Sequence, residues 1–355
     1  MNRKLLSLLL LIVIACSIFM TGCDNEQPST TKSQFKNYSF SYFDTVSTII
    51  GYEEKGEDFG AVCADIFALL EEYHKLFDIY NEYDGINNIY TVNQLVNGEH
   101  PVVKVDSKII DMLLYAKEMY EKTDGKMNVA MGSVLSIWHD YREIADENYG
   151  IGTLPPMSDL EEAAKHTDIN DLIIDEENST VWLADPDMRL DVGAFAKGYA
   201  VEMVARMLES RGKYNYVVNV GGNIRTTGKK ANGDKWKTGI ENPNNTSTYI
   251  EYIGLDTDAI VTSGSYQRYY IVNGKSYHHI IDPDTLMPAD KGFLSVSVIC
   301  KDSGMGDGLS TALFCMSLED GMALINSIDG VEAMWVKTDE TKHFSNGFAN
   351  YIVEK

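Results

Sequence analysis

The chain has 355 residues, 44% of them hydrophobic, and a formal net charge of −23 at pH 7. This length allows one large domain or two small ones, and the apolar content is enough for a sizeable core. So negative a surface excludes nucleic acid and anionic membrane surfaces as the main partner, because both would repel it. A local basic site for a phosphate-bearing ligand is compatible with this charge.

The first residues have the pattern of an export signal. Two basic residues precede an apolar run, Leu5 to Phe19, which is too short for a comfortable membrane-spanning helix. Met20-Thr21-Gly22-Cys23 follows and resembles a lipobox, the bacterial lipoprotein signal. This resemblance implies cleavage before Cys23 and a lipid on that cysteine. The alternative is an ordinary signal peptide followed by an incidental cysteine.

Three segments follow from this interpretation: a lipoprotein signal peptide at 1–22, a lipidated cysteine with its tether at 23–37, and one domain at 38–355. The tether is rich in Ser, Thr, Gln and Asn, a composition typical of flexible linkers. We therefore expect a protein that is anchored to the cell membrane by lipid only and faces outside the cytoplasm.

In the first half of the domain, hydrophobic patterns predict a mixture of strands and helices. A β-branched and aromatic alternation predicts a strand at 38–52, and helical periodicity follows at 59–77. A loop with a short helix is expected at 78–97. Further helices are expected at 107–122, at 129–142 and at 158–165, the last capped by Ser158 and Glu161. Two short strands that pair with each other are expected at 172–174 and 181–183.

The second half contains more strands than helices. A helix should follow Ala200, and strands are expected at 216–220, 236–240, 249–255 and 259–264. Asn273-Gly274 is a strong hairpin turn signal between strands at 268–272 and 275–281. A strand at 294–300, helices at 307–314 and 318–327, and strands at 331–337 and 350–353 complete the chain. Because helices and hairpins mix without regular βαβ alternation, the pattern predicts an α+β fold with a largely antiparallel sheet.

The stretch Asp191 to Ala200 is a candidate ligand loop. It places a carboxylate, two glycines and a lysine where an extended segment becomes a helix. A helix start offers free N–H groups and the positive end of a dipole, both suited to phosphate. A tight turn with a solvated lysine explains the same residues equally well.

Five stretches together carry a more specific signal. They are Asp191–Ala200, Asn219–Ile224, Val261–Gly264, His278–Pro283 and Asp307–Ala312. In this order they resemble the ApbE family, the FAD:protein FMN transferases, over the whole exported domain. The resemblance implies a single large α+β domain that splits FAD with Mg²⁺. The FMN half would pass to a Thr or Ser of an exported acceptor redox protein, and AMP would leave.

Asp307 and Thr311 are the candidate metal ligands. They are four residues apart, so they share one face of the expected helix. A carboxylate and a hydroxyl are hard oxygen ligands, which suit Mg²⁺. The resemblance adds the backbone carbonyl of Ala194. The alternative for Asp307 is a helix N-cap, with Thr311 only packing.

His279 is the candidate general base, because an imidazole titrates near neutrality and could take the proton of an acceptor hydroxyl. A strand histidine satisfied by hydrogen bonds is the alternative. His278 should face the opposite side of the strand. Asp282 either orients His279 or starts the turn, and the turn is the favoured interpretation.

The resemblance also implies contacts to FAD. Asp191 and Lys197 would bind it, Thr262, Ser263 and Gly264 would line the same cleft with Ile280, and Tyr80 would lie against the ligand rings. Contacts are also implied for Lys126, Met127 and Asn128.

The sequence departs from the family pattern at three places. Phe43-Asp44-Thr45 stands where Met-Gly-Thr is common, Met127-Asn128 has an amide in place of a carboxylate, and Asn223 replaces an Asp. The departure at Met127-Asn128 weakens the expected contacts there. Two other functions stay open: hydrolysis of FAD to FMN and AMP, and a non-catalytic lipoprotein that binds FAD.

Overall fold

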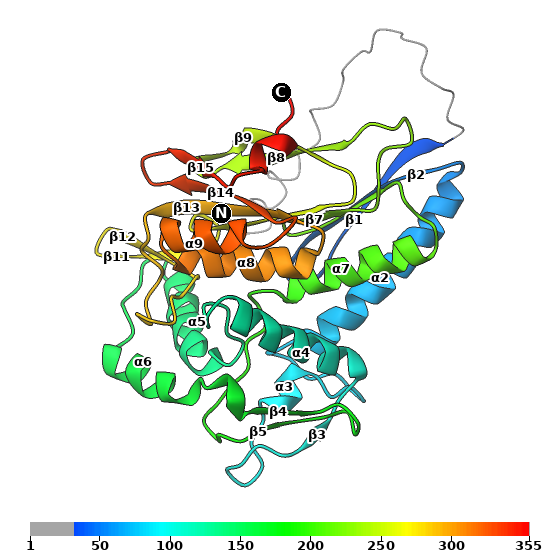
Figure 1. The fold of residues 1–355 in the computed structure, drawn as a ribbon. Helices are drawn as coiled ribbons and strands as arrows, with labels where there is room; N and C mark the ends of the chain where they lie inside the picture. Colours follow the sequence, from blue (N-terminus) through cyan, green and yellow to red (C-terminus); the bar gives the residue numbers. More distant parts are fainter. Residues whose placement is uncertain (1–31, 355) are drawn as a thin grey trace, which may run out of the picture. The chain divides into compact units, whose positions relative to one another are not determined.

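The computed structural model of the protein describes residues 32–354. Its main element is an eight-stranded sheet with the strand order β1-β2-β6-β7-β10-β13-β14-β15, and all named neighbours in it are antiparallel. Helices pack against this sheet within one unit (Figure 1). The predicted α+β fold with a mainly antiparallel sheet is therefore confirmed.

The elements have the following bounds. The strands of the main sheet are β1 (Ser33–Tyr42), β2 (Thr45–Glu53), β6 (Tyr216–Val220), β7 (Asn223–Thr226), β10 (Ala259–Gly264), β13 (Phe293–Cys300), β14 (Glu332–Lys337) and β15 (Lys342–Phe344). Smaller sheets are formed by β3 (Val103–Lys104), β4 (Leu172–Asp175) and β5 (Thr180–Leu183), by β8 (Trp236–Asn242) and β9 (Asn245–Leu255), and by β11 (Tyr269–Val272) and β12 (Lys275–His278). The helices are α2 (Gly56–Phe77), α3 (Ile89–Val92), α4 (Ser107–Lys122), α5 (Gly132–Glu147), α6 (Met157–Ala163), α7 (Ala196–Ser210), α8 (Ser303–Cys315) and α9 (Leu318–Asn326).

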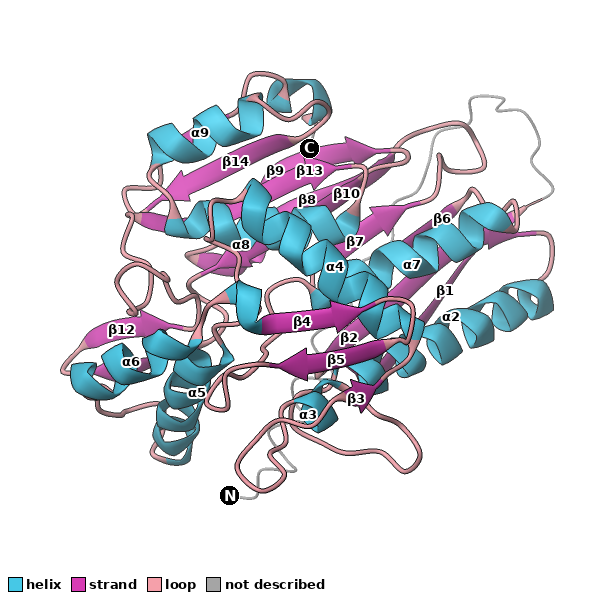
Figure 2. Cartoon of the chain, turned by 60° about the horizontal axis from the view of Figure 1, so that its bottom comes forward, coloured by secondary structure: helices cyan, strands magenta, loops and turns pink. Residues whose placement is uncertain are grey.

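Both faces of the main sheet are covered. Helices α2, α7, α8 and α9 lie on one face, and the β8–β9 hairpin lies on the other (Figure 1). The side chains alternate accordingly along β13, where Val296 and Val298 face the helices and Ile299 faces the hairpin. Beyond the helix layer, the small sheet β3-β5-β4 lies near α4 (Figure 2). Burial on both sides agrees with β13, where apolar residues occur on both faces of the strand.

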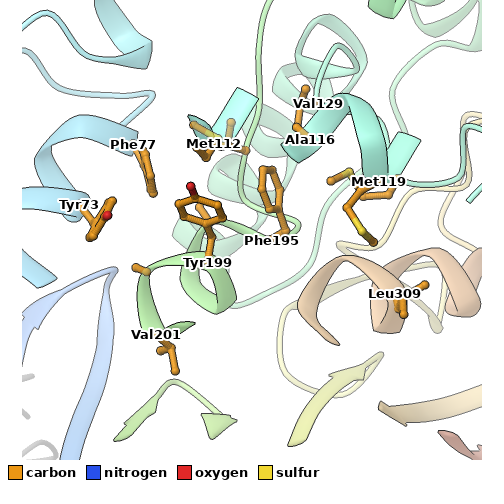
Figure 3. Close-up of a cluster of buried hydrophobic side chains, with 14 of the residues drawn as sticks. Tyr73, Phe77, Met112, Ala116, Met119, Val129, Phe195, Tyr199, Val201 and Leu309 are labelled. Atoms are coloured by element: carbon orange, nitrogen blue, oxygen red, sulfur yellow. The ribbon is translucent and has the colours of Figure 1, made fainter. Parts of the chain in front are cut away.

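The largest hydrophobic cluster lies where α2, α4, α7 and α8 meet (Figure 3). Phe195 and Leu309 are fully buried in it, and Tyr199 packs edge-on against Phe77 at a ring distance of 5.9 Å. This packing fixes α7 and α8, the two helices that carry the central stretch and the candidate metal ligands.

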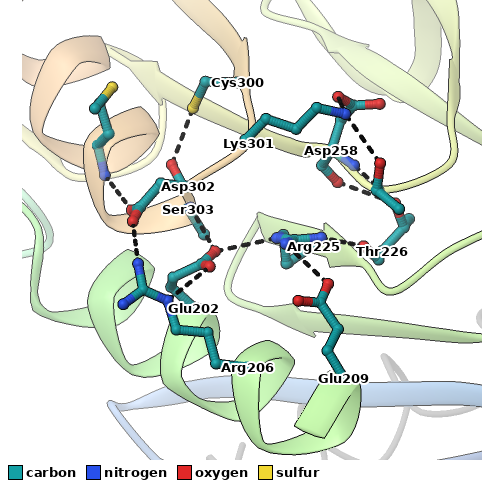
Figure 4. A network of polar contacts seen from close by, with 12 residues as sticks. Glu202, Arg206, Glu209, Arg225, Thr226, Asp258, Cys300, Lys301, Asp302 and Ser303 are labelled. Carbon is teal, nitrogen blue, oxygen red and sulfur yellow. Dashed lines mark hydrogen bonds and ion pairs between the residues drawn. The ribbon is translucent and has the colours of Figure 1, made fainter. Parts of the chain in front are cut away.

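A polar network also joins α7 to α8 (Figure 4). The Glu202 carboxylate on α7 pairs with Arg225 of β7 at 3.0 Å and accepts from the backbone N–H of Ser303 at 3.0 Å. Arg206 bridges Glu202 and Asp302, the N-cap of α8. A buried charge that loses its partner costs several kcal/mol, so this network constrains where α8 starts.

Two sequence expectations need correction at the N-terminal end. The single strand expected at 38–52 is the hairpin β1–β2, which turns at Phe43 and Asp44 with φ of 53° and 50°. Alternation continues across a two-residue turn, so the pattern could not show it. The domain also begins earlier than 38, because Ser33 already starts β1. The signal peptide, Cys23 and the rest of the tether lie outside the described residues.

Other expectations also need correction. The expected cap of α6 is wrong, because Pro156 occupies the N-cap position and makes no side-chain cap. The strand expected at 350–353 is a 3₁₀ helix at Phe348–Tyr351, and β15 closes the sheet instead. Strands β3 and β7 were not predicted, since each is short. Among residues 32–354, no helix is both long and apolar enough to span a bilayer.

Candidate active site

All predicted ligand, metal and catalytic residues of the domain line one cavity of about 720 Å³. This volume falls in the usual range for small-molecule sites. The cavity is bordered by the end of β10, by α5, by the start of α7, by α8 and by the β8–β9 hairpin. The predicted residues that line it are Tyr80, Lys126, Met127, Asn128, Asp191, Ala194, Lys197, Thr262, Ser263, Gly264, His279, Ile280, Asp307 and Thr311.

Three oxygen atoms converge on one wall of the cavity. Asp307 and Thr311 lie on the same face of α8, and the Thr311 hydroxyl donates to the carbonyl oxygen of Ala194 at 3.4 Å. Asp307 is not the N-cap, because α8 begins at Ser303 and is capped by the side chain of Asp302. A carboxylate, a hydroxyl and a carbonyl form a donor set that fits Mg²⁺.

The Asp307 carboxylate is only 6% exposed, and burial raises its pKa. It accepts from the backbone N–H of Gly198 at 2.9 Å and lies 4.0 Å from the ammonium of Lys197. A Cβ on Gly198 would meet the carbonyl oxygen of Ser303 at 2.3 Å, so glycine is what lets α7 approach α8. The Gly198 N–H at the start of α7 therefore donates to Asp307. The sequence had suggested that N–H groups at this helix start would be free to bind phosphate.

Asp191 shapes the loop before α7. Its carboxylate accepts from the backbone N–H of Gly193 at 2.8 Å, and its own N–H donates to the carbonyl of Val129 at 2.8 Å. Loss of solvent around the side chain raises the pKa of Asp191. Gly193 is not among the glycines with positive φ. The loop is thus a turn that also lines the cavity. The interpretation as a ligand loop and the interpretation as a tight turn each describe part of it.

The two neighbouring histidines have different surroundings. His278 packs edge-on against Phe314, and both of its ring nitrogens are used, one by the carbonyl of Ala289 and one by the backbone N–H of Ile280. His279 lines the cavity, and its Nδ1 lies 3.3 Å from the carbonyl oxygen of Arg268. A carbonyl only accepts, so this contact puts the proton on Nδ1 and leaves Nε2 as a free acceptor.

Burial is the main cause that lowers the pKa of His279 to about 3, and the nearby charges of Arg268, His278 and Arg142 contribute to the same shift. The imidazole is therefore neutral at physiological pH in the ligand-free protein. A neutral ring can accept a proton, which a base must do.

Within residues 32–354, Asp282 forms no hydrogen bond or ion pair with His279, and it forms the turn that follows. Its carboxylate accepts from the backbone N–H of Asp284 at 3.1 Å, and its carbonyl accepts from Leu286 at 2.8 Å. It is 1% exposed and pairs with Lys291 at 2.9 Å and Lys126 at 3.6 Å. The favoured interpretation of Asp282 as a turn residue is confirmed.

Several expected ligand contacts already have partners within the protein. Lys126 pairs with Asp284 as well as Asp282, so its charge is compensated without a ligand. The amide of Asn128 donates to the carbonyl of Thr167 and accepts from the backbone of Ala130. The departure from the family pattern at Met127 and Asn128 gave little weight to FAD contacts there, and these internal partners agree with that.

The hydroxyls of β10 also bond within the protein. Thr262 contacts Ser297 at 2.7 Å, and Ser263 contacts Ser310 at 2.8 Å and Thr311 at 3.4 Å. β10 continues through Gly264, so these hydroxyls lie on a strand. Ser263 instead links the cavity wall to the ligand face of α8.

A cationic end of the cavity was not anticipated from the sequence. Tyr80, 54% exposed, packs against His139 of α5 at a ring distance of 5.0 Å. Arg142 of α5 and Arg268 line the same cavity. The expected helix at 129–142 showed an amphipathic face, but nothing in it indicated that its polar side would face a ligand.

The hairpin contribution was also missed. Four consecutive residues of β8, Thr238 to Glu241, line the cavity together with Tyr249 of β9. The strands were expected, but their position beside the site depends on packing between distant segments. Asp44, at the β1–β2 turn, lines the cavity as well.

Fold and site together define an antiparallel α+β protein with a ligand cavity and a Mg²⁺-compatible donor set. A sequence model described as the ApbE family matches residues 43–335. A protein named FAD:protein FMN transferase from Klebsiella pneumoniae is 30% identical over 78% of this chain and 82% of its own length. One of the same name from Haemophilus influenzae is 28% identical over 95% and 93%.

Solved structures agree with these sequence matches. The ApbE protein of Thermotoga maritima superposes with a TM-score of 0.79 at 27% identity, covering 91% of this chain and 100% of that one. The flavin transferase ApbE from Vibrio cholerae gives a TM-score of 0.74 at 26% identity, with 90% and 99% covered. The chain belongs to the ApbE family.

Proposed function

We propose that this protein transfers the FMN half of FAD to a threonine or serine hydroxyl of an exported acceptor redox protein, with Mg²⁺ as the metal and AMP as the second product. The observation that carries the proposal is the convergence of three oxygen donors and a histidine with a free ring nitrogen in one cavity. The names of the relatives, FAD:protein FMN transferase, support the same reaction.

In this reaction the acceptor oxygen forms a bond to the phosphorus of the FMN half. The bond from that phosphorus to the bridging oxygen of the pyrophosphate breaks, and AMP leaves with that oxygen. Nε2 of His279 takes the proton of the acceptor hydroxyl. Mg²⁺ held by Asp307, Thr311 and the Ala194 carbonyl would spread the charge that develops on the pyrophosphate.

The low pKa of the free imidazole fits this role once the ligand is considered. Arg268 and Arg142 contribute to lowering the pKa of His279. Phosphate groups bound in the same cavity bring negative charge that offsets these cations. This negative charge would raise the pKa of His279 by offsetting the two arginines, while burial, the largest cause of its low pKa, stays.

A lipid anchor at Cys23 is the second part of the proposal. The lipobox-like Met20 to Cys23 behind an apolar run supports it, and Cys23 lies outside the described residues. We place the domain at the outer face of the cell membrane, held by lipid alone.

The test is a flavin-transfer assay with an envelope protein fraction of the same cells. The protein is incubated with the fraction, FAD and Mg²⁺, and AMP release and fluorescent flavin bands on a denaturing gel are measured. Mass spectrometry then maps the modified residue. EDTA should abolish both signals. AMP with free FMN but no band would favour FAD hydrolysis, and no AMP at all would leave only FAD binding.

A further inference from the structure

The chemistry of transfer constrains how an acceptor can approach. The hydroxyl oxygen of a threonine or serine is separated from its Cα by a single carbon, so it cannot reach far from its own backbone. The metal ligand Asp307 is buried, and the reacting phosphate must lie near it. The acceptor main chain beside the hydroxyl must therefore enter the mouth of the cavity.

β8 offers an unused strand edge at this place. It pairs with β9 on one side, and no other strand pairs with it within residues 32–354. Successive residues of a strand point to opposite faces, so a cavity that four consecutive residues line must lie along an edge of the strand. Thr238 to Glu241 are four such residues, and β9 occupies the other edge.

One face of β8 is covered by a side chain of its partner strand, so an added chain would approach along the edge. Gly239 lies in the middle of β8, where the ring of Tyr249 covers it: an added Cβ would meet that ring at 2.4 Å. Tyr249 is 47% exposed and lines the cavity. The outer edges of the main sheet, β1 and β15, do not line the cavity.

We propose that the acceptor protein binds as an extended segment that pairs with the free edge of β8, which places its Thr or Ser hydroxyl in the cavity. This inference rests on the transferase function proposed above. Main-chain hydrogen bonds to an edge strand tolerate varied side chains, and alternate side chains of the added strand face the cavity. β8 thus recognises an extended conformation of the acceptor, and the cavity selects the hydroxyl.

Disulfide trapping tests this pairing. The probe is the acceptor that the flavin-transfer assay identifies, in variants with one cysteine at each of the three positions before and after its modified residue. The full chain carries Cys23→Ser and Glu241→Cys, and its other cysteines in the described part, Cys63, Cys300 and Cys315, are buried. The matched control is Lys36→Cys on β1, an exposed residue of an edge strand away from the cavity.

Strand pairing predicts disulfides with alternate acceptor positions only, since neighbouring side chains point to opposite faces. The Lys36→Cys control should give none, and saturating FAD should leave the pattern intact. Three results would overturn the proposal: equal trapping at adjacent positions, no trapping with Glu241→Cys, or trapping that FAD abolishes, which would assign the edge to FAD. Absence of any flavinylated band at the outset would contradict the transferase function instead.

Discussion

At the scale of single residues, adjacent histidines with opposite surroundings allow a matched comparison. His279→Ala should lower flavin transfer by about 10²–10⁴-fold, because a positioned base contributes about that much. FAD affinity should stay within a few-fold, since the base acts on the acceptor. Single-turnover transfer at saturating FAD measures the effect.

His278→Ala is the control for this experiment. Its ring is held by Ala289 and Ile280 on the side away from the cavity, so transfer should fall far less. A larger loss in His278→Ala than in His279→Ala would reject the assignment of the base.

The pKa of His279 also predicts how stability depends on pH. The ring has an ordinary pKa of 6.5 when unfolded and about 3 when folded, so the unfolded chain binds more protons between these values. The stability that the neutral ring contributes is full above about pH 6.5 and is lost as pH falls toward 3. Between pH 7.5 and pH 5, the urea midpoint of unfolding should therefore fall more for the wild type than for His279→Ala. Equal falls would show that the ring is not held neutral.

Asp307→Asn should separate stability from metal binding. The amide oxygen can still accept the Gly198 N–H, while the cost of a buried charge disappears. Without divalent cation, we expect the variant to melt at least ~2 °C above the wild type. Saturating Mg²⁺ should raise the melting temperature of the wild type only. An equal Mg²⁺ shift in both proteins would place the metal elsewhere.

Much of this site could be predicted from the sequence, because the ordered stretches and the i, i+4 spacing of Asp307 and Thr311 are local features. Arg142 and Gly239 could not be predicted. Their place at the cavity follows from how α5 and the β8–β9 hairpin pack, and no local pattern encodes that packing.

At the scale of elements, the close contact between α7 and α8 positions the candidate metal ligands Asp307 and Thr311. A Cβ at position 198 would lie 2.5 Å from the Cβ of Asp307 and closer still to the Ser303 carbonyl. Gly198→Ala should therefore destabilise the fold by about 1–3 kcal/mol, the usual cost of overpacking. Urea unfolding measures this cost, and Mg²⁺-dependent AMP release should fall with it.

Gly60→Ala is the matched control, because a Cβ there meets nothing within 4 Å on α2. It should stabilise the protein by about 0.5–1 kcal/mol, since alanine loses less entropy than glycine in a helix. Similar effects of the two substitutions would mean that α7 and α8 can move apart freely.

The elements themselves could be predicted where periodicity is strong. The bounds of α4 and β6 agree with those expected. The β1–β2 turn was missed because Phe43 and Asp44 adopt positive φ without the glycine that usually marks such turns. The C-terminal strand was wrong because a short apolar run fits a 3₁₀ turn and a strand equally well.

At the scale of the whole molecule, the lipid anchor can be separated from catalysis. Cys23→Ala should release the protein from membranes while the domain keeps its activity, since the described fold begins only at β1. Membrane fractionation with the AMP assay on each fraction measures both effects. Equal membrane association of variant and wild type, with the signal peptide removed in both, would refute the lipid anchor.

The early start of β1 at Ser33 has a consequence for which acceptors the enzyme meets. With a lipid on Cys23, about ten residues connect the bilayer to the folded domain, and such a leash spans at most ~35 Å. Such a tether would keep the domain close to the lipid surface. An acceptor anchored in the same membrane is presented there at an effective concentration on the order of millimolar, whereas a freely diffusing protein is met only at its bulk concentration. The proposed anchor would therefore favour acceptors held in the same membrane over acceptors that diffuse freely.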